Sequence, residues 1–210
     1  MDVKIRVATK GDCKDIARLI MNRTQTSLSG QKSGPRGNEL SSFCVHIDLA
    51  VHDKMSDQVK LSCDELQRDG FSQNPLFECL VAEVADENKS KEGFTIIGYA
   101  LYFYIYCTWK GRSMYLEDLY VMPEFRGFGI GKSLLSNIAK VAKEKQCARL
   151  HLIVLNWNTH SLDFYTARGA QDLTVKEGWH LVHFDGQSLD HLANETQQIR
   201  KCVSGEDNVV

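Results

Sequence analysis

A glycine-rich loop between a predicted strand and a predicted helix is the feature that most constrains this chain. Three glycines alternate with other residues in Arg126-Gly127-Phe128-Gly129-Ile130-Gly131-Lys132-Ser133. Because glycine has no Cβ atom, these positions can adopt unusual backbone angles and let a ligand approach the backbone closely. The helix that follows begins with N–H groups that lack an intrahelical partner and with the positive end of its dipole. The loop is therefore suited to hold a phosphate or pyrophosphate.

Two widespread phosphate-binding motifs do not fit this loop. A Walker A loop requires glycine five residues before its Gly-Lys-Ser, and this chain has Arg126 there. A dinucleotide-binding GxGxxG that begins at Gly127 requires glycine where this chain has Lys132. A nucleotide hydrolase that uses Gly131-Lys132-Ser133 is therefore a remote alternative. The spacing that the loop does have is Arg126-x-x-Gly129-x-Gly131.

The hydrophobic pattern predicts alternating strands and helices in the second half of the chain. This order is typical of an α/β or α+β domain with a mixed sheet. The expected strands are 3–7, 77–84, 96–106, 113–121, 149–154 and 179–184. The expected helices are about 9–20, 62–69, 130–146 and 160–168. Ser62 and Glu65 have the spacing of a capping box, and Gly70 is suited to end that helix.

Two segments, residues 22–47 and residues 194–210, have no periodic hydrophobic pattern. The first is rich in Ser, Gly, Gln and Asn, which predicts a flexible insertion without its own core. The second is polar and is expected to be a disordered tail. Residues 188–193, before the tail, are expected to form one or two helical turns. The sequence thus predicts a single domain over residues 1–193.

Composition argues against several kinds of partner. Lys plus Arg number 25 and Asp plus Glu number 27, so the net charge is −2, whereas nucleic-acid-binding proteins usually have a basic excess. The longest apolar run, 96–107, is too short to span a bilayer. The first residues lack the apolar core of a secretory signal. We expect no nucleic-acid or membrane partner and a cytoplasmic location.

No metal site is expected. The seven cysteines are scattered along the chain without a CxxC pair, which indicates reduced thiols rather than zinc ligands or disulfides. His180 and His183 lie three residues apart in the expected last strand. This spacing places the two imidazoles on opposite faces, so they are not expected to bind one ion together.

The loop and two residues downstream of it resemble the GNAT superfamily of acetyl-CoA-dependent N-acyltransferases. The pyrophosphate loop of that superfamily is Arg/Gln-x-x-Gly-x-Gly/Ala, which residues 126–131 match without a gap. Asn158 and Tyr165 stand where the family has an Asn and a Tyr, the Tyr four residues before Gly169. The resemblance implies the GNAT fold, a mixed and mostly antiparallel central sheet flanked by helices. It also implies acetyl-CoA as acetyl donor, no metal, and a homodimer.

Two further motifs resemble the diamine acetyltransferase branch of this superfamily. They are Tyr-Leu-Glu-Asp at 115–118 and Glu-Gly-Trp at 177–179. Within the branch, residues 106–112 resemble the thialysine Nε-acetyltransferases, because Cys107 stands where the polyamine enzymes have Asp. Lys54 also adds a positive charge near the expected substrate entrance. The resemblance thus implies acetyl transfer to the primary side-chain amine of thialysine-like amino acids. A polyamine N-acetyltransferase and a non-catalytic acyl-CoA-binding module are the alternatives.

The resemblance also assigns roles to individual residues. An ammonium group must lose a proton before it attacks a thioester, and Glu117 is the candidate base, acting through a water. Tyr165 is the candidate proton donor to the leaving thiolate, and a backbone N–H near Val121 is expected to meet the oxyanion. The expected coenzyme-binding residues are Leu119, Tyr120, Val121, Arg126, Gly127, Phe128, Gly129, Ile130, Gly131, Lys132, Asn158, Thr159, His160 and Ser161. The expected substrate-binding residues are His52, Asp53, Trp109, Glu117, Asp118, His151, Leu152, Ile153 and Glu177. Strand alternation places Asp118 on the face opposite Glu117, where it positions substrate or supports a dimer contact.

Overall fold

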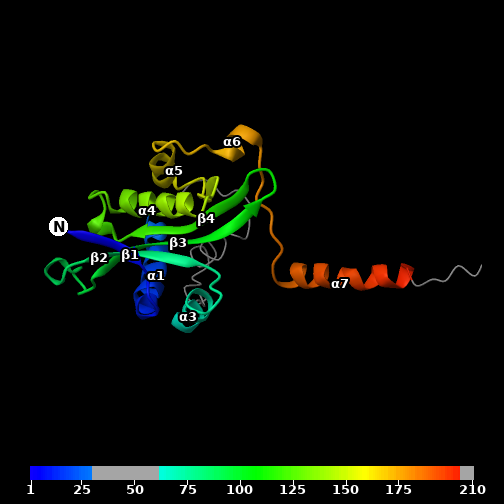
Figure 1. Ribbon diagram of the computed structural model, residues 1–210, viewed down its shortest axis with the longest axis horizontal. Coiled ribbons are helices and arrows are strands. Elements are labelled where there is room, and N and C mark those ends of the chain that lie inside the picture. The colour runs from blue at the N-terminus through cyan, green and yellow to red at the C-terminus, as the bar shows by residue number, and fades with distance from the viewer. Residues whose placement is uncertain (30–61, 204–210) are drawn as a thin grey trace, which may run out of the picture.

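The computed structural model describes residues 1–29 and 62–203, which contain one five-stranded sheet with helices on both faces (Figure 1). The strands are β1 (Val3–Val7), β2 (Glu78–Val84), β3 (Ile96–Cys107), β4 (Gly111–Val121) and β5 (Arg149–His151). They lie side by side in chain order; β1 to β4 are antiparallel, and β5 is parallel to β4. The mixed, mostly antiparallel sheet predicted from the sequence is confirmed.

Helices cover both faces of this sheet. On one face lie α1 (Cys13–Ser29) and α3 (Cys63–Gly70), and on the other lies α4 (Ile130–Glu144), with α5 (Thr159–Thr166) beyond it (Figure 1). Short 3-10 turns are found at Lys10–Asp12, Asp86–Asn88 and Pro123–Phe125. The capping box predicted for α3 is confirmed: Ser62 Oγ accepts from the Glu65 N–H at 3.1 Å, and Glu65 Oε2 accepts from the Ser62 N–H at 2.8 Å.

The core fills both interfaces between helices and sheet. Helix α4 buries Leu134 and Ile138 completely. On the other face α1 buries Ile16 and Leu19. Two tyrosines of the central strand β3, Tyr99 and Tyr102, are also fully buried. Burial of these large side chains on both faces makes β3 and β4 the rigid centre of the domain.

The chain after residue 170 differs from its predicted structure. The expected strand at 179–184 is wrong: these residues form no regular element, and no described strand pairs with them. A short helix, α6 (Leu173–Glu177), precedes them, and the helix α7 (Gly186–Val203) follows. Helix α7 is therefore much longer than the one or two turns expected at 188–193. It also includes the first part of the segment expected to be a disordered tail.

Two other boundaries differ from their predicted positions. Helix α1 continues to Ser29 instead of ending near Ile20, so the first residues of the expected insertion at 22–47 are helical. Strand β5 ends at His151 instead of continuing to residue 154. In the described part of the chain, no helix has both the length and the apolar character needed to cross a bilayer.

A partly buried ionic network joins the first strand to the start of α1. The Arg6 guanidinium donates to both carboxylate oxygens of Asp12, at 2.8 and 2.9 Å, and to Glu83 at 2.8 Å. Asp12 also accepts from the backbone N–H and the hydroxyl of Thr9, at 2.7 and 2.8 Å. The Arg6 hydrogen bonds lower the pKa of Asp12 to about 2, with a further contribution from Thr9 and against the opposing effect of burial.

This network should make stability depend on pH. A carboxyl group with a lowered pKa stabilises the fold above its unfolded pKa of about 4 and loses that effect as pH falls through the folded value. Asp12→Asn should therefore reduce the free energy of unfolding at pH 7 by about 1–3 kcal/mol. The difference from wild type should shrink between pH 4 and pH 2 when urea unfolding is measured across that range.

Asp15→Asn is the matched control for this measurement. Asp15 forms an ion pair with Arg18 at 2.9 Å, but its side chain is 33% exposed, so its loss should cost at most about 0.5 kcal/mol. Equal losses for the two variants, or a loss at Asp12 that does not change with pH, would contradict the prediction.

Candidate active site

The sheet opens between β4 and β5. The two strands pair only from Ser113 to Tyr115, opposite Arg149 to His151. Beyond Tyr115, no described strand pairs with this side of β4, although the other side remains paired with β3 up to Val121. The second half of β4 therefore presents a backbone edge to an opening.

The backbone hydrogen-bond pattern shows which groups face this opening. Val121 lies opposite Gly98, and the Met122 N–H donates to the Ile97 carbonyl at 2.9 Å. This pattern places Val121 in a wide, non-hydrogen-bonded pair, so its own N–H and C=O point away from β3. Leu119, two residues earlier, has the same orientation. The backbone groups of Leu119 and Val121 thus face the side expected to pair with the pantetheine arm.

A β-bulge interrupts the strand pair at the start of the opening. Leu101 lies opposite Asp118 and Tyr102 lies opposite Leu116, so Glu117 is the additional residue on β4. Glu117 is exposed, whereas Asp118 is 7% exposed. Bulges redirect side chains and are common next to active sites. The bulge therefore presents the candidate base at the point where the sheet divides.

The glycine-rich loop closes one end of the opening. Gly127 and Gly129 have φ angles of 84° and 80°, in the left-handed region that favours glycine. A Cβ atom at either position would meet no other atom within 4 Å, so the loop is open on its ligand side. Helix α4 starts at Ile130, directly after Gly129. The loop thus has the form of the predicted anion cradle, and a pyrophosphate fits it.

Arg126 is attached to the end of β4. Its Nε donates to the Val121 carbonyl at 2.9 Å, and its guanidinium carbon lies 5.5 Å from the centre of the Tyr120 ring. This contact holds the loop against the strand whose backbone faces the opening. One edge of the guanidinium is used in this way, and its remaining N–H groups are the part that could bind a phosphate.

Helix α5 brings the expected site residues that follow β5 next to the glycine-rich loop and the end of β4. A Cβ on Gly131 would lie 3.9 Å from both Phe164 and Val121, so α4, α5 and β4 meet here. Tyr165 is half-buried and packs against the core. Asn158 is the N-cap of α5, and its Oδ1 accepts from the Ser161 N–H at 3.2 Å. The oxygen of this amide therefore caps the helix, and the contact of Asn158 with the coenzyme stays a prediction.

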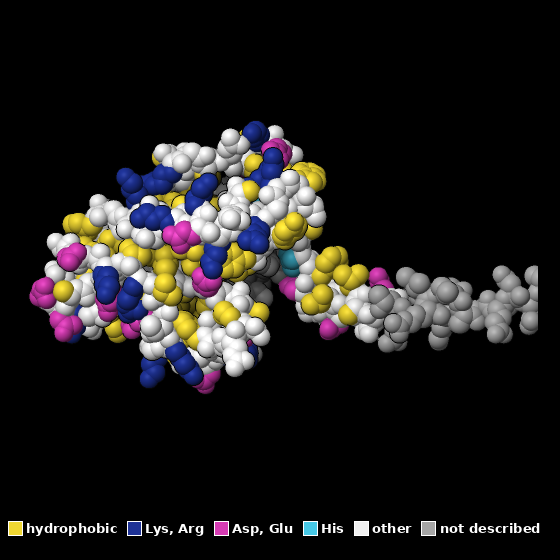
Figure 2. Space-filling view, viewed as in Figure 1, with side chains coloured by type: hydrophobic (Ala, Val, Ile, Leu, Met, Phe, Trp, Pro, Cys, Tyr) yellow, Lys and Arg dark blue, Asp and Glu magenta, His cyan; other side chains and the backbone are white. Residues whose placement is uncertain are grey.

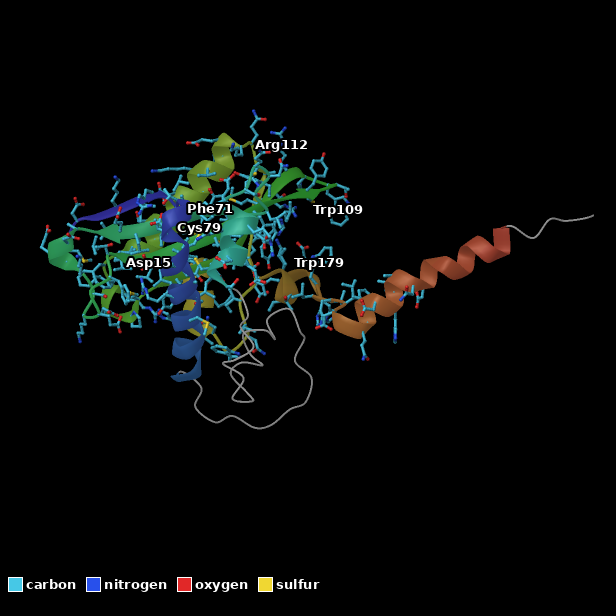
Figure 3. The ribbon with its side chains drawn as sticks, turned by 90° about the horizontal axis from the view of Figure 1, so that it is seen from below. Asp15, Phe71, Cys79, Trp109, Arg112 and Trp179 are labelled. Atoms are coloured by element: carbon cyan, nitrogen blue, oxygen red, sulfur yellow. The ribbon has the colours of Figure 1, made fainter. Side chains whose placement is uncertain are left out.

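The expected substrate residues do not form one group in the described chain. Trp109 and Trp179 contact each other at 6.4 Å between ring centres, and Trp179 Nε1 donates to Glu177 at 2.7 Å (Figure 3). This group lies beside the β3–β4 turn. Gly111 at that turn precedes Glu117 by six residues of β4, roughly 20 Å at the usual rise of a strand. Trp109 and Glu177 are thus brought together, but away from Glu117.

The remaining substrate candidates have varied surroundings. His151 pairs with Tyr115 at the end of β5, and burial, followed by the positive charge of Arg149, lowers the pKa of its imidazole. Leu152 is half-buried and Ile153 is exposed. Asp118 is buried and accepts a hydrogen bond from the Tyr99 hydroxyl at 2.8 Å. His52 and Asp53 lie outside the described residues.

Two features of this region were not predicted as parts of the site. Tyr99 lies in an uninterrupted apolar run, so the pattern showed its burial but not its hydrogen bond to Asp118. Trp179 belongs to the Glu-Gly-Trp motif, which could have indicated its contact with Trp109. A separate hollow of about 400 Å³, lined in part by Tyr104, Tyr106 and Arg112, lies near the C-terminal end of α4. It is therefore not part of the glycine-rich cradle.

A divided sheet edge beside a glycine-rich helix start defines an acetyltransferase, and comparison with known proteins agrees. The model of the Acetyltransferase (GNAT) family matches residues 47–170. A thialysine N-epsilon-acetyltransferase of Bos taurus is 42% identical over 193 residues, which are 92% of this chain and 98% of that protein. The spermidine/spermine N(1)-acetyltransferase-like protein 1 of Homo sapiens is 38% identical over 91% of this chain but only 24% of its own length.

A solved structure shows the same fold at lower sequence identity. An integron cassette protein from the mobile metagenome of V. cholerae superposes with a TM-score of 0.60 and 22% identity, covering 92% of this chain and 98% of that one. The chain belongs to the GNAT acetyltransferase family and has the GNAT fold. The resemblance seen in the sequence is confirmed, and the family implies acetyl-CoA as the acetyl donor.

Substitution in the cradle should weaken coenzyme binding. Gly129→Ala places a Cβ at a φ of 80° in the open side of the loop, which strains the backbone by about 1–2 kcal/mol and moves the N–H groups expected to hold the phosphates. We expect the dissociation constant for coenzyme A, measured by titration calorimetry, to rise about 10-fold or more.

Gly93→Ala is the matched control because Gly93 has a φ of 88° and equally open surroundings but lies in the β2–β3 loop. It should show a similar loss of stability and bind coenzyme A like wild type. Equal affinities for wild type and Gly129→Ala would refute the proposed role of this loop.

Proposed function

We propose that this chain transfers the acetyl group of acetyl-CoA to the terminal side-chain amine of thialysine-like amino acids. The carrying observation is its 42% identity, over 92% of its length, to a curated thialysine N-epsilon-acetyltransferase. The glycine cradle and the exposed Glu117 at the divided sheet supply a matching site. The partner is thus a small amine, and the net charge of −2 gives no support to a nucleic-acid partner.

A polyamine acetyltransferase is the second candidate because a human relative carries that name at 38% identity. Long polyamines are held through several positive charges, which need carboxylates around them. At the end of β3 this chain has Cys107 where the polyamine enzymes of the branch have Asp. The missing carboxylate favours a substrate with one reacting amine and an amino-acid end.

In the proposed mechanism the chain supplies positioning and two proton transfers. An amine with a pKa near 10 is protonated at neutral pH and cannot attack. Glu117, at the bulge, accepts this proton through a water. The Val121 N–H faces the opening and donates to the developing oxyanion. Tyr165 then donates a proton to the leaving sulfur.

The proposal places the expected residues on two sides of the reacting centre. On the coenzyme side, the Leu119 backbone, the 126–132 loop and the start of α5 hold acetyl-CoA. On the amine side, His151 borders Glu117, while the buried Asp118 next to Glu117 accepts from Tyr99. The lowered pKa of His151 keeps its imidazole neutral, so it can approach a cationic substrate without repulsion.

We further propose that the protein is a homodimer and cytoplasmic. Val182 and Phe184 are 79% and 59% exposed, and hydrophobic side chains gather where this segment joins α7 (Figure 2). An apolar surface of this kind is typical of an interface, and a second copy is the proposed occupant. Cys13, Cys63, Cys79, Cys107 and Cys147 are free thiols, which is consistent with a reducing compartment.

Steady-state kinetics with a panel of amines tests the substrate. With acetyl-CoA as donor, we expect kcat/KM for thialysine to exceed that for spermidine by about 10-fold or more, since one unmatched charge costs at least about 1.4 kcal/mol. Lysine should fall between them. A spermidine value far above the thialysine value would favour the polyamine alternative.

Tyr165→Phe is the control that separates an enzyme from a non-catalytic coenzyme-binding module. It removes only the hydroxyl that donates the proton, so kcat should fall by roughly 100-fold while coenzyme A affinity stays near that of wild type. A non-catalytic module would bind coenzyme A without turnover, and the variant would be indistinguishable from wild type.

Light scattering after size-exclusion chromatography tests the dimer. Wild type should elute near twice its chain mass of 23.8 kDa. Phe184→Glu, which places a charge in the proposed interface, should shift the species towards the monomer. Leu76→Glu alters a residue that is 72% exposed before β2 and should leave the mass unchanged. A monomeric wild type would contradict the proposal.

A further inference from the structure

A buried hydrogen bond joins β3 to Asp118, the residue directly after the bulge at Glu117. We propose that Tyr99 and Asp118 form a positioning pair that fixes the register of β4, and thereby the placement of Glu117 and of the backbone after it. The inference rests on the proposed function, in which Glu117 accepts the proton of the amine.

The geometry of this pair is that of a strong hydrogen bond. The Tyr99 hydroxyl donates to Asp118 Oδ2 at 2.8 Å. Tyr99 is fully buried and Asp118 is 7% exposed. A carboxylate that has left water is costly unless it is hydrogen-bonded, and a hydrogen bond to a charged group is stronger than a neutral one. Any movement of β4 that separates these two side chains is therefore disfavoured.

The hydrogen bond between Tyr99 and Asp118 runs diagonally from β3 to β4. Tyr99 lies opposite Tyr120, and Asp118 lies opposite Leu101, so the hydroxyl of one strand reaches two residues along the other. The ring of Tyr99 also packs at 6.4 Å from the ring of Tyr120. Tyr99 thus contacts β4 on both sides of Leu119, where the backbone faces the opening.

A one-residue slip of β4 would break this arrangement. Because strand side chains alternate, a shift by one residue moves every side chain to the other face. Asp118 would leave the α1 face, and the buried Tyr99 hydroxyl would lose its acceptor. A bulge leaves one residue unpaired and disrupts the hydrogen-bond ladder locally, so a residue directly after the bulge is an effective place for an anchor.

The neighbourhood of Asp118 supports this role more than direct contact with substrate. Cys79 is on the same face, since it lies opposite Leu101. Burial first, and the negative charge of Asp118 second, raise the pKa of the Cys79 thiol, which therefore stays neutral. Figure 3 shows Cys79 beneath α1 and α3, in the covered layer of the molecule.

A second tyrosine on β3 provides a matched control. Tyr102 is also fully buried, and its hydroxyl donates to Glu78 at 2.8 Å. Its partner is on β2, so this hydrogen bond does not fix β4. Tyr102→Phe and Tyr99→Phe each remove the hydroxyl of a buried tyrosine that donates to a carboxylate, and only Tyr99→Phe should affect the reaction.

The test measures kcat, the KM for acetyl-CoA and thermal unfolding for Tyr99→Phe, Asp118→Ala, Asp118→Asn and Tyr102→Phe, using whichever amine the wild type acetylates. We expect kcat to fall about 10-fold in Tyr99→Phe and Asp118→Ala, with KM for acetyl-CoA within about 2-fold of wild type. Asp118→Asn keeps an acceptor for the Tyr99 hydroxyl, so its kcat should regain most of what Asp118→Ala loses. The double variant Tyr99→Phe/Asp118→Ala should be no slower than either single variant.

Other outcomes would overturn the inference. If Tyr99→Phe loses stability as Tyr102→Phe does but keeps the wild-type kcat, the pair is only structural. If Asp118→Asn raises the KM for the amine and Tyr99→Phe does not, Asp118 is a substrate ligand. Amide hydrogen exchange at 116–119 gives a readout independent of turnover: it should accelerate in Tyr99→Phe and not in Tyr102→Phe. A wild type inactive towards every amine would instead refute the proposed function and leave this exchange result to judge the pair.

Discussion

The early end of pairing between β4 and β5 is the constraint on which the rest of the site depends. Three residue pairs hold these strands together, from Ser113 to Tyr115, and beyond them β4 is paired only with β3. The alternation of backbone groups along an antiparallel strand then directs the N–H and C=O of Leu119 and Val121 into the opening. The Val121 carbonyl already accepts from Arg126, so a ligand can use the N–H and C=O of Leu119 and the N–H of Val121. No side chain is needed for these contacts, and the neighbouring side chains are left to perform chemistry.

The elements around this opening are rigid for separate physical reasons. The glycine loop requires positive φ angles that its glycines adopt without strain. Arg126 ties that loop to the Val121 carbonyl. The Tyr99–Asp118 hydrogen bond, directly after the bulge, limits the freedom of Glu117. The coenzyme cradle and the candidate base are thus fixed to the same strand, which is the arrangement that catalysis by positioning needs.

The expected amine-side residues are more dispersed than those of the coenzyme side. Trp179 contacts both Trp109 and Glu177 at the β3–β4 turn, far along β4 from Glu117. The segment that carries Trp179 has large exposed apolar side chains and no strand partner among the described residues. Both facts are consistent with an assembly that covers this segment, which is why we propose a homodimer together with the function.

The sequence alone determined what depends on neighbouring residues. It predicted the strands up to Val121, the Ser62 capping box and the glycine cradle, because periodicity, caps and turns are local. It also carried the family motifs around Glu117 and Tyr165. Only the tertiary structure decided the rest. The bulge, the bond between Tyr99 and Asp118 and the missing strand at 179–184 each depend on a partner distant in the chain. Residues 179–184 have the composition of a strand, but strand formation requires a paired neighbour, and composition cannot specify one.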